Sequence, residues 1–172
     1  NSNTFVGAGA GIANTWGGSN TFMGRAAGNK NTMGNSNAFF GSDAGVSNTM
    51  GERNSFFGSS AGGGTTTGTD NSYFGASAGG ATTGSFNSFF GVGAGFITSG
   101  NNNSLFGYYA GRESTAAHDN AFFGYEAGAL TLAGSNNAFF GSLAGFQNRG
   151  GANNAFFGGG ARELSLGSCC MC

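Results

Sequence analysis

Apolar and polar residues recur along the chain with a period of 17 residues. The repeated unit reads N-x-F-F-G-x-x-A-G-x-x-x-T-x-G-x-x, and its positions are numbered from the Asn. Ten copies follow one another, and only the two that begin at Asn71 and Asn87 are shortened to 16 residues. A fixed short period indicates that each unit packs against its neighbours rather than folding alone.

Gly, Asn, Thr, Ser and Phe dominate the unit, and these residues are poor helix formers. We therefore predict two short strands per unit, one centred on the Phe pair and one on the T-x-G segment, with Gly-rich corners between them. The fold class is all-β, a parallel β-solenoid or β-roll of about ten 17-residue coils. At about 4.8 Å per coil these would form a rod of roughly 48 Å. We assign residues 1–168 to this single repeat domain and residues 169–172 to a Cys-rich C-terminal tail.

Position one is Asn in every copy, which predicts a ladder of amides that stacks the coils along the rod axis. Its members are Asn3, Asn20, Asn37, Asn54, Asn71, Asn87, Asn103, Asn120, Asn137 and Asn154. The Gly of positions five and nine fit corners where a Cβ has no room, and the Ala of position eight fits a narrow inward corner.

Positions three and four form two apolar columns. Adjacent strand residues point to opposite faces, so one column fills the interior and the other faces outward. We assign position three to the core: Phe5, Phe22, Phe39, Phe56, Tyr73, Phe89, Leu105, Phe122, Phe139 and Phe156. Position four is assigned to an interface between subunits: Phe40, Phe57, Phe74, Phe90, Phe106, Phe123, Phe140 and Phe157, preceded by Val6 and Met23. The alternative is a bulge or corner that turns both rings inward.

An outward column of this length would make an apolar stripe larger than soluble monomers usually expose. Because the stripe runs parallel to the rod, a side-by-side bundle with two-fold or three-fold symmetry would cover it. We therefore expect the chain to associate with copies of itself, as a closed oligomer or as a filament. Neither end has a polar capping segment, so we also expect the rod to continue into another domain, another subunit or a longer array.

Charge removes several classes of partner. The chain has six basic and seven acidic residues among 172, for a net charge of -1. That leaves no basic surface for nucleic acid. No apolar run approaches the roughly 20 residues of a spanning helix, so membrane insertion is not expected either.

Catalytic and metal-binding chemistry has few candidates. The acids Asp43, Glu52, Asp70, Glu113, Asp119, Glu126 and Glu163 lie at variable positions of different copies, and the single His, His118, is far from the cysteines. We expect no enzyme activity, no metal site and no cofactor. Tyr108, Tyr109 and Tyr125 fall in one variable corner of successive copies and could contact a glycan or another surface target.

All three cysteines, Cys169, Cys170 and Cys172, are in the tail. One interpretation is interchain disulfides that tie parallel subunits together, and the other is a flexible tail with free thiols.

The stretches from Asn54 to Gly62 and from Asn87 to Gly95 read N-S-F-F-G-x-x-A-G. This pattern resembles the N-T-F-I-G-Y-N-A-G repeats of bacterial and phage surface-fibre proteins, and more distantly the N-S-x-A-I-G repeats of trimeric autotransporter adhesin heads. The resemblance covers nearly the whole chain, although this unit is longer than that of the adhesin heads and has Phe where they have Ile. It implies a left-handed β-roll, three chains side by side, and a place outside the cell or on the cell or virion surface.

The first functional hypothesis is therefore a non-enzymatic, structural or adhesive extracellular fibre segment, with a trimer favoured. The alternative is an ice-binding solenoid, suggested by the looser Thr column of Thr15, Thr32, Thr49, Thr66, Thr82 or Thr83, Thr98 and Thr115, which gives way to Leu132, Arg149 and Leu166. A third reading takes the F-F-G spacing as a disordered phenylalanine-glycine barrier, but disordered spacers need not keep a register.

Overall fold

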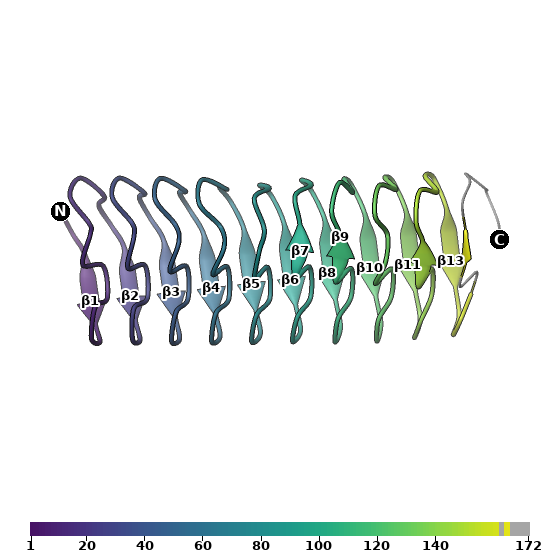
Figure 1. Cartoon of the computed structure of the whole chain (residues 1–172), viewed down its shortest axis with the longest axis horizontal. Coiled ribbons are helices and arrows are strands. Elements are labelled where there is room, and N and C mark those ends of the chain that lie inside the picture. Colours follow the sequence, from purple (N-terminus) through teal and green to yellow (C-terminus); the bar gives the residue numbers. More distant parts are fainter. Residues whose placement is uncertain (162–163, 166–172) are drawn as a thin grey trace.

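Each repeat contributes one strand to a single parallel sheet (Figure 1). The computed structural model describes residues 1–161 and 164–165, which form a parallel β-solenoid of about nine turns with about 17 residues per coil. The sheet has ten strands: β1 (Thr4–Val6), β2 (Thr21–Met23), β3 (Ala38–Phe40), β4 (Ser55–Phe57), β5 (Ser72–Phe74), β6 (Ser88–Phe90), β8 (Ser104–Phe106), β10 (Ala121–Phe123), β11 (Ala138–Phe140) and β13 (Ala155–Phe157). The predicted all-β parallel solenoid is confirmed, and the disordered reading is wrong.

Equivalent residues of neighbouring coils lie directly above one another. Phe39 of β3 pairs in register with Phe56 of β4. The two short copies keep the same register, because Tyr73 of β5 pairs with Phe89 of β6 and Phe89 pairs with Leu105 of β8. The missing residue is therefore absorbed elsewhere in the coil, and every column of the repeat becomes a ladder along the rod.

The second predicted strand is wrong for most coils. Within residues 1–161 and 164–165, the short strands on this side are β7 (Ile97–Thr98) paired with β9 (Glu113–Ser114), and β12 (Gln147–Asn148) paired with β14 (Leu164–Ser165). In the first coil the amides of Thr15, Trp16 and Gly17 all donate to the carbonyl of Thr32, at 3.1, 2.9 and 3.2 Å. Successive amides converge on one carbonyl only where the backbone bends, so the T-x-G segment is a bend and not an extended strand.

Position-three side chains and the Ala of position eight make up the apolar part of the interior. Phe39 and Ala44 are fully buried, whereas Phe5, also assigned to the core, is 36% exposed because only the coil of β2 covers it. Neighbouring rings of this inward ladder, defined as the position-three column from Phe5 to Phe156, lie 4.6 to 4.9 Å apart and within 8° of parallel. The ring spacing equals the spacing of strands in a sheet, so the backbone sets the stacking distance.

Two Gly columns hold the corners of each coil. At position five, Gly41 has φ +137° and a Cβ there would lie 2.5 Å from the carbonyl oxygen of Gly58 in the next coil. At position nine, Gly45 has φ +57° and a Cβ there would lie 2.5 Å from the ring of Phe39. One column lets coils approach each other, and the other makes room for the inward ring.

Candidate functional site

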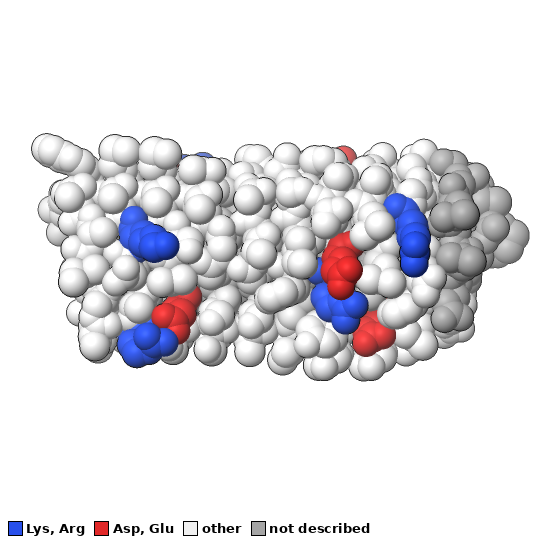
Figure 2. All heavy atoms as spheres, in the orientation of Figure 1, with Lys and Arg blue, Asp and Glu red and all other residues white. Residues whose placement is uncertain are grey.

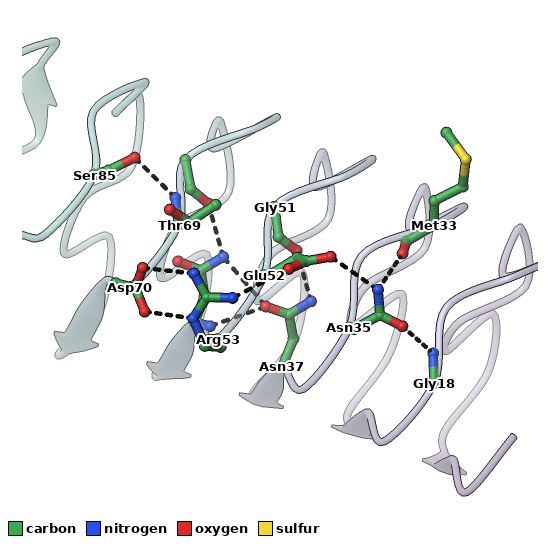
Figure 3. Close-up of polar contacts among 12 residues, drawn as sticks. Gly18, Met33, Asn35, Asn37, Gly51, Glu52, Arg53, Thr69, Asp70 and Ser85 are labelled. Atoms are coloured by element: carbon green, nitrogen blue, oxygen red, sulfur yellow. Dashed lines mark hydrogen bonds and ion pairs between the residues drawn. The ribbon is translucent and has the colours of Figure 1, made fainter.

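The position-one Asn side chains hold the coils together. The Nδ2 of Asn37 donates to the carbonyl of Gly51 at 2.8 Å, and its Oδ1 accepts from the backbone N–H of Asn54 at 2.9 Å (Figure 3). Within-coil bonds of this kind run from Asn3 to Asn137, and coil-to-coil bonds connect each member to the next as far as Asn154. The side chains from Asn20 onward are buried, so their amides serve the scaffold and not a ligand.

A second buried polar column lies just before the bend. In the first coils it is an amide ladder, in which Asn31 Nδ2 donates to Asn14 Oδ1 at 2.7 Å and Asn48 Nδ2 donates to Asn31 Oδ1 at 2.8 Å. Further along the rod the column continues as Thr65, Thr82, Thr98, Ser114, Thr131 and Asn148, all essentially buried. Sequence reasoning missed it because its residue type changes from coil to coil, and only its constant spacing from the inward Ala could have revealed it.

Polar and charged side chains at one corner of the coils also form bonds along the rod (Figure 3). Gly18 N–H donates to Asn35 Oδ1 at 2.8 Å, and Asn35 Nδ2 donates to Glu52 Oε1 at 2.9 Å. Arg53 meets both carboxylate oxygens of Asp70, at 2.7 and 2.9 Å. The hydrogen bond from Arg53 lowers the pKa of Asp70, and the same bond raises the pKa of Arg53. The Arg53 side chain is 55% exposed and that of Asp70 is 28% exposed, so solvent screens this pair and it contributes little to stability.

His118 continues the same corner column. The Nδ1 of its ring accepts from the backbone N–H of Asn101 at 3.0 Å, and the backbone N–H of His118 donates to Ser135 Oγ at 3.2 Å. The neighbouring Asp119 accepts from Asn102 at 3.0 Å. These bonds tie one ring nitrogen of His118 and one carboxylate oxygen of Asp119 to neighbouring coils. Glu163 lies outside the described residues, and within those residues no three His, Cys, Asp or Glu side chains are close enough to hold a metal ion.

The position-four residues form the outward ladder, defined as Val6, Met23, Phe40, Phe57, Phe74, Phe90, Phe106, Phe123, Phe140 and Phe157. From Phe40 to Phe157 the rings stack without interruption, 4.7 to 5.2 Å apart and within 6° of parallel. Each ring covers the face of the next, so solvent reaches mainly the edges, and Phe90 and Phe140 each remain 37% exposed. The rod therefore carries an exposed aromatic column along its length.

Little charge interrupts the surface. Figure 2 shows one face on which the few charged side chains stand alone or in small acid–base groups, with uncharged residues between them. Uncharged surface of this kind is compatible with close packing against another molecule, because few ionic groups would lose water on contact. The described residues contain no helix of the length and hydrophobicity required to cross a membrane.

The Thr column on the surface has fewer members than the sequence suggested. Thr32 and Thr49 donate their hydroxyls to the carbonyl of the next coil, each at 3.0 Å. Thr82 and Thr98 belong to the buried column instead, because the shortened coils lost a residue after this point and not before it. Beside the Thr column the bend exposes Trp16, together with Met33 and Met50. The result is neither a continuous rank of free hydroxyls nor a flat polar face.

Tyr108, Tyr109 and Tyr125 do come together. The rings of Tyr108 and Tyr125 are stacked at 5.5 Å, and those of Tyr108 and Tyr109 meet at 4.2 Å with a tilt of 54°. Cys169, Cys170 and Cys172, with the disulfide hypothesis attached to them, lie outside the described residues.

The geometry thus identifies a β-solenoid of about 17-residue repeats with two Phe stacks. Comparison of the chain with protein-family models, with curated proteins and with solved structures finds no match.

Proposed function

We propose that the chain is a non-enzymatic structural rod that packs side by side with copies of itself through the outward ladder. In this proposal it forms a fibre or adhesive segment outside the cell or on the surface of a cell or virion. A trimer is the favoured assembly, as in the fibre repeats that the sequence resembles. The observation that carries the proposal is the uninterrupted stack of exposed rings from Phe40 to Phe157.

The direction of this stack explains why a second copy is the natural partner. Strand spacing gives the ladder a length of roughly 45 Å, with no polar residue in its column. A globular partner would cover part of such a stripe, whereas a parallel rod carries a matching stripe of equal length and pitch. The ring faces are already covered within each stack, so the exposed edges of one rod would pack against the edges of another and bury apolar surface.

The polar side chains support a scaffold rather than a catalyst. Asn37 Oδ1, Asn48 Nδ2 and His118 Nδ1 bond to neighbouring coils. The charged pair of Arg53 and Asp70 does the same on the surface. A substrate would have to compete with these bonds for the same atoms.

Ice binding has weaker support. The hydroxyls of Thr32 and Thr49 are engaged with backbone carbonyls, and Trp16 is 79% exposed beside them. A thermal hysteresis measurement tests this alternative directly, and the rod proposal predicts no hysteresis.

Sedimentation velocity at micromolar concentration tests the rod proposal. We expect the unmodified chain to sediment as an oligomer and the double variant Phe74→Thr, Phe106→Thr as a folded monomer. Thr keeps the strand propensity while it removes the ring. The control is Met50→Thr, which removes a more exposed apolar side chain from the bend and should leave the oligomer intact. A folded, monodisperse monomer of the unmodified chain, or equal dissociation by Met50→Thr, would contradict the proposal.

A further inference from the structure

A shallow pocket lies away from the outward ladder, where the two shortened coils meet the coil of β8. Its volume is about 500 Å³, within the range of about 300–1,000 Å³ that is usual for small-molecule sites. The side chains that shape it are Ser77, Phe96, Ile97, Tyr109, Arg112 and Glu113. Phe96 and Ile97 are each about two-fifths exposed, at 38% and 40%, so the pocket opens to solvent.

Tyr109 is held in an unfavourable backbone conformation at this pocket. Its φ is +53°, in the left-handed region that bulky residues avoid. Every coil has a positive φ at this position, where the other residues are Gly, Ala, Ser, Asp, Glu or Leu, so the conformation belongs to the repeat. Tyr109 is the one aromatic residue at this position, and its ring is what distinguishes this coil.

Gly93 makes the space that the Tyr109 ring uses. A Cβ at residue 93 would lie 2.2 Å from the Cε1 atom of Tyr109. The ring therefore places its Cδ1–Cε1 edge against Gly93 of the preceding coil. The absence of a side chain at residue 93 makes room for this one aromatic ring at the edge of the pocket.

Arg112 adds polar groups beside that ring. Its guanidinium carbon is 5.4 Å from the centre of the Tyr109 ring, and its Nη2 lies 3.0 Å from Glu113 Oε1. Its Nε is buried and has no hydrogen-bond partner among residues 1–161 and 164–165. A guanidinium has five N–H groups, so Arg112 keeps donors for a ligand while Glu113 offers carboxylate oxygens as acceptors.

These features define the chemistry of the ligand. Rings and aliphatic groups on the pocket wall suit a molecule with an apolar face, and the donors and acceptors suit hydroxyls around its rim. The charges of Arg112 and Glu113 cancel, which favours a neutral ligand over an anion. A pyranose ring has this combination of a C–H face and peripheral hydroxyls.

We infer that this pocket binds a neutral saccharide, with Tyr109 and Phe96 packing against the sugar ring and Arg112 and Glu113 bonding to its hydroxyls. The site continues toward the next coil through the stacked pair Tyr108 and Tyr125, which are 44% and 51% exposed. An oligosaccharide lying along the rod would contact both parts. This inference does not depend on the outward ladder, because none of these residues belongs to it.

The test is saturation-transfer NMR followed by calorimetry. The probes are neutral mono- to tetrasaccharides of hexoses, deoxyhexoses and N-acetylhexosamines, with sialyllactose and a glucuronate disaccharide as anionic probes. We expect a neutral probe to bind in the millimolar to micromolar range and more tightly than either anion. If no neutral probe binds at millimolar concentration, or if an anion binds best, the inference is wrong.

Substitution of Tyr109 separates binding from folding. Tyr109→Gly removes the ring and relieves the left-handed strain, so we expect at least a tenfold loss of affinity with an unchanged or higher melting temperature. Arg112→Gln should also weaken binding about tenfold through the lost donors. The matched control is Leu143→Gly, at the same position of a distant coil with φ +60°, which should leave binding unchanged. Full affinity in Tyr109→Gly would overturn the inference.

Discussion

The inward and outward ladders are built from the same residue type, one position apart in sequence, yet they have opposite relations to solvent. Phe122 is fully buried in β10, whereas its neighbour Phe123 in the same strand keeps an exposed edge. The outward rings of Phe106 and Phe123 are 4.7 Å apart, and the inward rings of Phe122 and Phe139 are 4.6 Å apart. Stacking distance is therefore common to both, and the alternation of the strand alone decides which ladder holds the coil together and which is available to a partner.

The two ladders also differ in what confines them. An inward ring is enclosed by the Ala of position eight, the Gly of position nine and the buried polar column, as Phe39 is by Ala44 and Gly45. An outward ring is confined only by the rings above and below it. Substitutions in the inward ladder should therefore change folding, and those in the outward ladder should change assembly.

The adjacent pair in β10 gives the largest expected contrast. Phe122→Ser removes a buried ring between stacked neighbours and should lower the free energy of unfolding by about 3–5 kcal/mol. Phe123→Ser removes a partly exposed ring, so its cost should be about 1–2 kcal/mol, together with weaker self-association. Chemical denaturation and sedimentation of both variants measure the two effects. Equal losses of stability and assembly would mean that the ladders are not functionally distinct.

Tyr73 makes the inward ladder sensitive to alkaline pH. Burial raises the pKa of its hydroxyl, which has no hydrogen-bond partner in the part of the chain that the structure describes. Below about pH 10 the tyrosine is neutral in both the folded and unfolded states, so it gives no pH dependence. Above that pH the unfolded chain loses the proton while the folded chain keeps it, and stability falls by up to about 1.4 kcal/mol per pH unit.

The Tyr73→Phe variant isolates this contribution. Phe occupies the same position in neighbouring coils, so the ring fits, and the exposed tyrosines titrate equally in both proteins. Melting temperatures measured from pH 8 to 11 should diverge above pH 10, with the variant the more stable. Parallel curves over this range would show that the Tyr73 hydroxyl reaches solvent in the folded state.

Leu105 is the one interruption of the inward ring stack, between Phe89 and Phe122. Leu105→Phe should join the two halves and raise stability by about 1 kcal/mol, the usual contribution of an added aromatic pair. The column beside it has the smaller Ser114 where the preceding coil has Thr98, which leaves room for the ring. Leu132→Phe, at an exposed position on the bend, is the control and should have little effect. A lower melting temperature for Leu105→Phe would indicate overpacking.

Much of this architecture followed from the repeat. The period predicted the parallel stack, and the Phe pair predicted a strand with one inward and one outward residue. The T-x-G segment was mispredicted because Thr suits both a strand and a bend in which its hydroxyl bonds to the backbone. Only the convergence of the amides of Trp16 and Gly17 on the carbonyl of Thr32 distinguishes the two. The corner bonds of His118 join residues 17 apart whose types share no motif.

The pocket was only partly predictable. The Tyr residues of the variable corner were visible in sequence, but their association with Phe96 and Arg112 depends on the coils of β6 and β8 lying next to each other. The contribution of Gly93 was hidden for a different reason. Gly is abundant in this chain, and its role appears only when the Tyr109 ring is seen against it.

The strands keep their register although two coils lack one residue at the bend, so the sheet and the bend can change independently of each other. Tyr73 still pairs with Phe89 across the first shortened coil, so the spacing between coils does not depend on the number of residues at the bend. Duplication of one repeat would lengthen the rod by one strand spacing and would need no new type of contact. Substitutions at the bend would change the surface chemistry and leave the stacking of the strands unchanged. The rod therefore combines a constant axial spacing with surface residues that can differ from one coil to the next.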